Sequence, residues 1–264
     1  MRVAFLTVIL LLATLLSSAA QQTSPASPQP LQILQQALSA LNGSTQTRDV
    51  TLSGSAHYMA GSDDETGTAE LTAIATGASS MKLSLSSGPR NEVRNLTVDP
   101  PTGTWSGPDG ISHNIIYHNL LNEPSWFSPV AAISRLLASP ESVASFLDTE
   151  TLESQTVQHI SITLQPLPSI ASFAPPLLQH LTQVDLYLDA TTNLPAAMTF
   201  AVHPDDNALV DIPIEVRFTD YRLVSGAQVP FHVQRFLNNG LVLDLQLENA
   251  TINSGVSATA LAIR

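Results

Sequence analysis

The sequence predicts a mainly β (α+β) protein: a single large, curved antiparallel sheet with helices covering its concave, apolar face. Apolar and polar residues alternate along most of the chain, as in strands with one dry and one wet face. Hydrophobic residues make up 44% of the 264 residues and charged residues only 12%, which favours half-buried strands over long solvated helices. Strands do not alternate regularly with helices, so a parallel α/β fold is disfavoured.

The chain begins with the features of a secretory signal peptide. Arg2 precedes an apolar run from Val3 to Leu16, and small residues at 17–20 suit cleavage after Ala20. This run is shorter than the ~20 residues that cross a bilayer. We predict a signal peptide at residues 1–20, a flexible Pro/Ser-rich leader at 21–30 and one domain at 31–264. The mature protein is expected in the periplasm or outside the cell, without stable membrane insertion.

Composition narrows the class of partner. The chain contains no cysteine, so disulfides and zinc–thiolate sites are excluded, and a bacterial envelope fits better than an animal-type secreted domain. Ten basic residues against 22 acidic ones give a net charge of −12. Such a surface repels phosphate backbones, so no nucleic-acid partner is expected.

Two helices are expected on the apolar face of the sheet. Leu31, Leu34, Leu38 and Leu41 follow helical spacing, and Gly43 is a natural stop. Residues 128–139 also have helical spacing, with a proline near the start. A hairpin loop is expected at 61–67. About eleven strands are expected, at residues 50–58, 69–75, 81–85, around 105, 143–148, 157–164, 184–189, 196–203, 212–224, 229–237 and 241–252.

Motifs for catalysis and for metal binding are absent from the sequence. It has no Gly-x-Ser-x-Gly, His-Glu-x-x-His or phosphate-binding loop, and Lys82 is its one lysine. The seven histidines show no metal-ligand spacing. Acidic clusters at 62–65 and 203–207 suit either calcium or a hydrated turn, and turn chemistry favours the second. We therefore expect no catalytic residue, metal or cofactor, although a hydrolase with dispersed carboxylates stays open.

The most informative signal is apolar material that faces inward. Such residues either fill a core together, which is the commoner outcome, or leave an apolar cavity between helices and sheet. The candidate cavity residues are Leu34, Leu38, Leu41, Trp126, Phe127, Leu136, Leu243 and Leu245.

The C-terminal half resembles a known family. Its motifs are Asp185-Leu-Tyr-Leu-Asp, then Asn193-Leu-Pro, then Phe218-Thr-Asp-Tyr-Arg, then Gly226-Ala-Gln-Val-Pro-Phe. This order is similar to the periplasmic lipoprotein-carrier (LolA-like) superfamily. The resemblance implies an open half-barrel with helices as a lid, which binds lipid or lipoprotein acyl chains without catalysis. Arg48, Arg90 and Arg94 are candidates for the arginine that closes the lid in these carriers.

These observations predict an exported, non-enzymatic binder or carrier of an apolar ligand, either a lipid or a lipoprotein acyl chain, in the bacterial envelope. Its expected partners are that ligand or lipoprotein, or another envelope protein. The alternative is a structural or protein-interaction module of the envelope that uses the same sheet without a ligand.

Overall fold

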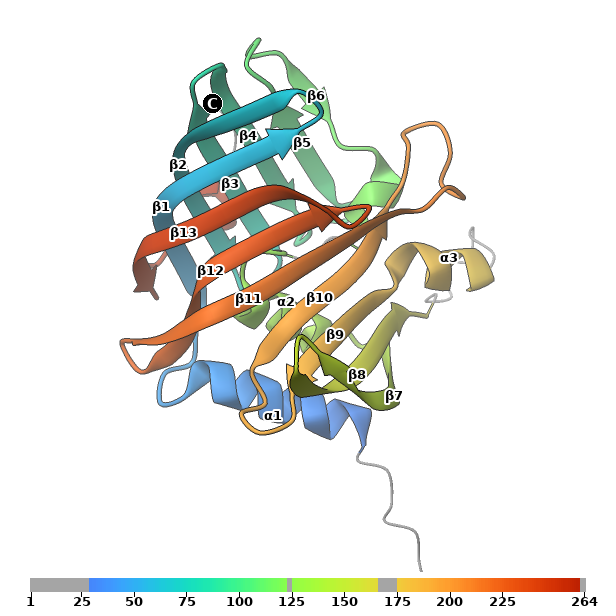
Figure 1. Cartoon of the computed structure of the whole chain (residues 1–264). Helices are drawn as coiled ribbons and strands as arrows, with labels where there is room; N and C mark the ends of the chain where they lie inside the picture. Colours follow the sequence, from blue (N-terminus) through green and yellow to red (C-terminus); the bar gives the residue numbers. More distant parts are fainter. Residues whose placement is uncertain (1–28, 123–124, 166–174, 262–264) are drawn as a thin grey trace, which may run out of the picture.

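The computed structural model describes residues 29–122, 125–165 and 175–261, which form one open sheet of thirteen antiparallel strands with helices beside it (Figure 1). The expected signal peptide, and the leader up to residue 28, lie outside the described residues. In the described part of the chain, no helix is long and apolar enough to span a bilayer.

The sheet consists of two meanders joined edge to edge. The N-terminal meander contains β1 (Asp49–Ala60), β2 (Asp63–Ile74), β3 (Ala78–Leu85), β4 (Gly88–Asn95), β5 (Thr102–Ser106) and β6 (Ser112–Asn114). The C-terminal meander contains β7 (Ser142–Leu152), β8 (Gln155–Leu164), β9 (Val184–Asp189), β10 (Pro195–Val202), β11 (Ile212–Val224), β12 (Ala227–Leu237) and β13 (Gly240–Ile252). Pairing of β1 with β13 joins the two halves, so β6 and β7 form the two edges. The fold class expected from the sequence is confirmed.

The strand count differs from the expected eleven because β4 and β6 were missed. The expected hairpin loop at residues 61–67 is also too long. β1 continues to Ala60 and β2 begins at Asp63, so the turn consists of Gly61 and Ser62. The acidic residues that follow the turn pair with β1, because polar residues at the solvent end of a long hairpin still complete the backbone ladder.

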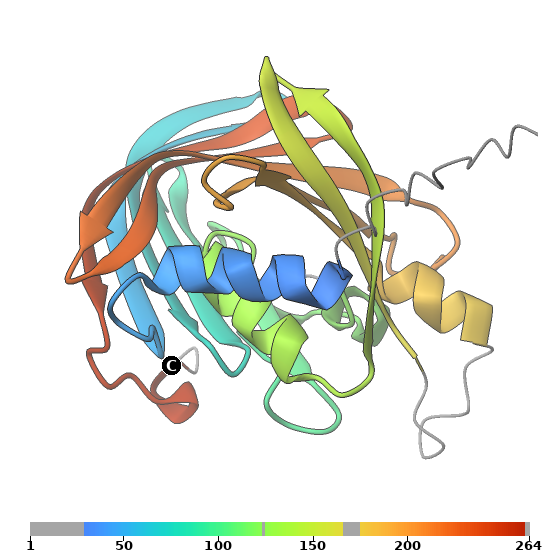
Figure 2. The ribbon, with the colours of Figure 1, turned by 90° about the horizontal axis from the view of Figure 1, so that it is seen from below.

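Helix α1 (Pro30–Asn42) lies across the open side of the curved sheet (Figure 2). Its buried side chains are Ile33, Leu34, Ala37 and Leu41. The expected stripe was therefore rotated: Leu38 lies at the border of the buried arc, and Leu31 is 50% exposed. At 100° per residue the buried four span a single arc that leaves Leu31 outside it.

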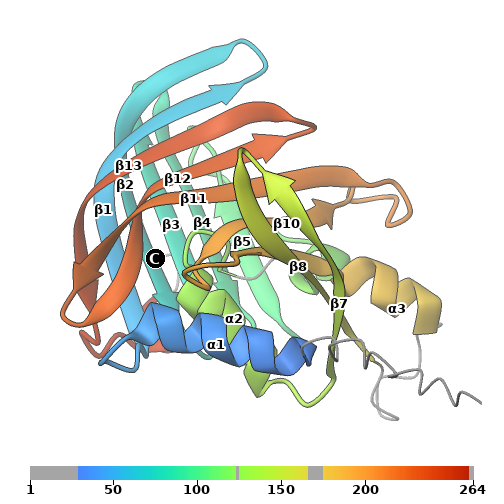
Figure 3. The same cartoon turned by 60° about the horizontal axis from the view of Figure 1, so that its bottom comes forward.

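Helix α2 (Pro129–Ala138) packs beside α1 inside the curve of the sheet (Figure 3). Proline at its first position suits a helix start, because that N–H has no helical acceptor. Val130, Ile133 and Leu136 are buried in the same core as α1. A third helix, α3 (Pro175–Thr182), packs against β8 and buries Leu178 and Leu181. Short 3-10 turns at Tyr117–Leu120 (η1) and Ala258–Leu261 (η3) complete the described fold.

We expect Gly43→Ala to lower the free energy of unfolding by about 2 kcal/mol, measured by urea denaturation. Gly43 ends α1 with φ 52° and ψ −114°, where a side chain is strained. A Cβ there would lie 2.3 Å from the carbonyl oxygen of Gly226, whose backbone anchors the chain after α1.

Gly61→Ala is the control for this substitution. Gly61 has φ 63° and open space around it, so only the conformational cost of about 1 kcal/mol is expected. Equal losses for the two variants would contradict the role of the α1–Gly226 contact.

Candidate ligand-binding site

The space between the helices and the sheet is largely occupied by side chains. Leu34, Leu41, Trp126, Phe127, Leu136, Leu243 and Leu245 are buried in one continuous core, and Leu38 packs against it partly buried. The pocket beside Phe127 has a volume of only about 10 Å³. Of the eight candidate cavity residues, Leu243 lines a larger pocket, and the other seven are not part of the lining of that pocket.

That pocket lies on the concave face of the N-terminal meander, beyond the helix-covered core. Its volume is about 340 Å³, and it opens to solvent. The register places Leu243 beside Tyr58, Arg90 beside Leu83 and Glu92 beside both Met81 and Trp105. The apolar wall consists of Tyr58, Met81, Leu83, Trp105 and Leu243, and the charged groups in the lining are Arg90, Glu92 and Arg235.

Arg90 stands at one side of the pocket, held by acidic groups and an aromatic ring. Its guanidinium lies 4.4 Å from the ring centre of Tyr58, and Nη2 donates to Asp63 at 2.9 Å. Nη2 is also 3.5 Å from Glu65. Hydrogen bonds from the Ser87 backbone N–H and from the hydroxyls of Ser86 and Ser87 lower the pKa of Glu65 to about 2. Glu65 is therefore ionised beside Arg90 at neutral pH.

A second charged group, here called the floor of the pocket, consists of Glu92 and Arg235 in the lining and the neighbouring Arg94. Nε of Arg94 donates to Glu92 at 2.8 Å, and Nη1 of Arg94 donates to the carbonyl oxygen of Asn119 at 2.8 Å. The Arg235 guanidinium lies 4.8 Å from the ring centre of Trp126. Burial alone raises the pKa of Glu92, but attraction to Arg94, its hydrogen bond and the charge of Arg235 outweigh this and hold the pKa below its usual value. The floor is thus ionic and in contact with the apolar core.

Trp105 forms an exposed rim of the pocket. It is 44% exposed and stacks on His113 of β6, with ring centres 4.5 Å apart. Its ring is exposed to solvent in the free protein and is therefore available to cover an apolar ligand.

Comparison with solved structures places this architecture among known folds. A LolA superfamily protein from Nitrosomonas europaea is 11% identical, with a TM-score of 0.55 over 90% of this chain and 99% of that one. An outer membrane lipoprotein-sorting protein domain from Vibrio parahaemolyticus is 11% identical, with a TM-score of 0.54 over 88% and 95%.

The chain has the LolA fold. A DUF1329 family protein from Desulfovibrio piger also shares it, at 8% identity and a TM-score of 0.54 over 88% of this chain and 97% of that chain. Identities this low show the fold alone. No protein-family model matches the sequence, and no curated protein matches it.

The structure places the three arginines that the sequence resemblance singled out in different surroundings. Arg90 and Arg94 both lie on β4 at the concave face, whereas Arg48 is exposed and its backbone N–H bonds to Asn253. Arg94 is tied to Asn119 in η1, and Arg235 to Trp126 just before α2. Sequence reasoning missed Arg235.

The sequence analysis missed this site because β4, which carries its charged residues, lacks the alternation of apolar and polar residues that predicts a strand. β4 presents Arg90, Glu92 and Arg94 to the interior, so the usual apolar alternation is absent. The available signal was the alternation of charge: these three residues lie two apart, which is the period of a strand face.

Proposed function

We propose that the protein is an exported, non-enzymatic binder or carrier of an amphiphile whose apolar chain lies in the concave pocket of the half-barrel. The observation that carries this proposal is the 340 Å³ opening bordered by Tyr58, Met81, Leu83, Trp105 and Leu243, next to an otherwise filled interior. Sites for small apolar ligands typically have volumes of ~300–1,000 Å³ and a few polar groups that orient the ligand. A single acyl chain, from a free lipid or from a lipoprotein, fits this description.

The polar groups of the pocket favour an anionic end on the ligand. The charged groups in the lining are two arginines, Arg90 and Arg235, against one carboxylate, Glu92, in a chain whose net charge is −12. Nε of Arg90 is buried and has no hydrogen-bond partner among the described residues. A carboxylate or phosphate oxygen would satisfy a donor of this kind by a charge-assisted hydrogen bond.

Two measurements test the proposal. Organic extracts of protein purified after export are analysed by mass spectrometry, and a co-purified acyl lipid is expected. A long-chain fatty acid and its methyl ester are then titrated separately, and the acid is expected to bind at least tenfold more tightly. Equal affinities would refute the anionic end. A protein that carries no lipid and binds neither ligand would refute the carrier function and favour the interaction module.

We expect Met81→Trp to weaken fatty-acid binding at least tenfold, because the larger side chain occupies the pocket. Met81 is half-buried and lines the pocket from β3. The matched control is Ser84→Trp on the same strand, where the side chain is exposed and outside the pocket lining. Fluorescent fatty-acid displacement measures both variants. Unchanged affinity in a folded Met81→Trp protein would place the ligand elsewhere.

A further inference from the structure

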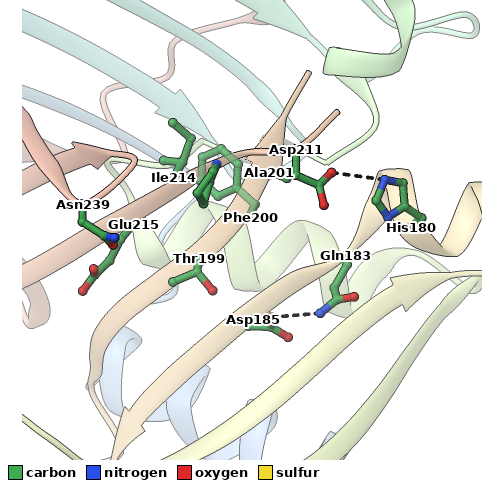
Figure 4. Close-up of a pocket in the computed structure, with 11 residues that line it drawn as sticks. His180, Gln183, Asp185, Thr199, Phe200, Ala201, Asp211, Ile214, Glu215 and Asn239 are labelled. Atoms are coloured by element: carbon green, nitrogen blue, oxygen red, sulfur yellow. Dashed lines mark hydrogen bonds and ion pairs between the residues drawn. The ribbon is translucent and has the colours of Figure 1, made fainter. Parts of the chain in front are cut away.

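A separate cluster of two histidines and a carboxylate lies where α3 meets the connection between β10 and β11. His180 is in the last turn of α3, His203 directly follows β10, and Asp211 directly precedes β11. Nε2 of His180 is 3.2 Å and Nδ1 of His203 is 3.4 Å from Oδ1 of Asp211. Figure 4 shows His180 and Asp211 pointing toward each other across the rim of a pocket.

These distances match the edges of a metal coordination shell. Four ligands about 2.0–2.1 Å from a tetrahedral zinc ion lie about 3.3 Å from one another. The ligand atoms of His180, His203 and Asp211 all lie within 4.8 Å of one another. Imidazole and carboxylate are also the ligand types that zinc and its first-row neighbours accept.

The side chains of the cluster lie close together, yet hydrogen bonds do not satisfy all of their buried polar atoms. Nε2 of His180 is buried without a hydrogen-bond partner among the described residues, although Asp211 is 3.2 Å away. The His203 side chain is fully buried, and its Nδ1, 3.4 Å from Oδ1 of Asp211, also lies 3.2 Å from the carbonyl oxygen of Val210. Buried polar atoms are rarely left unpaired, so an additional bound group is the physical expectation here.

His203 is held in place by hydrogen bonds of its backbone. Its backbone N–H and carbonyl oxygen are both bonded to the Asn119 amide, at 2.8 and 2.7 Å.

An open pocket of about 470 Å³ adjoins the cluster, and His180 and Asp211 both line it. A metal ion held by three protein ligands needs a fourth ligand, and in open sites this is water. Solvent in this pocket has access to the exposed side of His180 and Asp211, whose side chains are 37% and 52% exposed.

We propose that His180, His203 and Asp211 bind one divalent transition-metal ion of the zinc class, with water as the fourth ligand, and that this ion ties α3 to the end of β10. The site is distinct from the concave lipid pocket and does not depend on the function proposed for it.

The test is metal binding by protein purified after export and without a histidine tag. Zinc is titrated against a chelating indicator, and one zinc per chain is expected. Cobalt is added separately, because four-coordinate cobalt gives intense visible absorption bands and six-coordinate cobalt gives weak ones. We expect the intense bands, displacement of cobalt by zinc but not by magnesium or calcium, and a higher melting temperature with zinc.

Two variants and a control assign the ligands. His180→Ala and Asp211→Asn alter half-exposed side chains, so the protein is expected to fold, and each should weaken zinc binding at least tenfold. His57→Ala removes another histidine that is paired with an aspartate, Asp64 at 2.6 Å, and should leave zinc binding unchanged. Absence of stoichiometric zinc binding, six-coordinate cobalt, or full affinity in both ligand variants would overturn the proposal.

Discussion

Replacing Glu92 by glutamine is expected to lower the free energy of unfolding by about 3 kcal/mol at pH 7. Glutamine keeps the size of the side chain and an oxygen that accepts from Nε of Arg94, so the variant removes mainly the charge. Arg94 is 5% exposed, and Arg235 lies close to the same carboxylate. Two arginine charges would then face the apolar core without the carboxylate that neutralises them.

The pH dependence of this effect has a definite sign. Because the pKa of Glu92 is lowered in the folded protein, its carboxylate stabilises the fold above the pKa of about 4.3 that it has when unfolded. That contribution disappears as the pH falls through the lower, folded pKa. Urea denaturation at pH 7 and at acidic pH should therefore show that the unfolding free energies of the unsubstituted protein and of Glu92→Gln converge below about pH 4.

Glu70→Gln is the control for the charge itself. Glu70 on β2 pairs with Lys82 at 3.8 Å, and both side chains are more than half exposed. Solvent screens such a pair, so a loss of less than about 1 kcal/mol is expected. Similar losses in the two variants, or a Glu92→Gln loss that does not change with pH, would contradict the ionic floor.

Trp126→Ala is expected to lower the free energy of unfolding by about 4 kcal/mol, because it leaves a large cavity in the core. Trp126 is 2% exposed, and its ring meets that of Phe127 edge-on, with centres 5.4 Å apart. The substitution also removes the aromatic face under Arg235. Denaturation monitored by circular dichroism measures the loss.

Trp105→Ala provides the matching control, since the chain has only two tryptophans. Trp105 is 44% exposed at the rim of the pocket, so stability should fall by less than about 1 kcal/mol while fatty-acid affinity falls at least tenfold. A large stability loss from Trp105→Ala, with unchanged binding, would reverse the roles assigned to the two rings.

The strands with one dry face were predictable because each carries its own period-two signal. β9 and β11 were expected with the bounds that the structure shows, and α2 was expected within one residue at each end. β4 was not predictable in this way, since its inward side chains are charged and are neutralised by residues far away in the chain. The buried face of α1 was misplaced because Leu31 and Ile33 are equally apolar, and only packing against the sheet and α2 selects between them.

For the candidate sites too, the sequence predicted local properties but not contacts between distant segments. The eight proposed cavity residues are buried in the core or packed against it, and seven of them do not line the pocket of about 340 Å³. That pocket lies among residues of β1, β3, β4, β5, β12 and β13. The histidines gave no metal signal, because His180, His203 and Asp211 lie on three separate segments.

The sequence by itself determined the class of fold, through local periodicities that are written along each strand and helix. Tertiary structure alone decided which inward positions are filled, which stay open and which polar groups meet. The physical reason is that alternation records only whether a side chain avoids water, a local property. A pocket or a ligand set depends on distances between segments, which arise only when β1 pairs with β13 and the sheet curves around its helices.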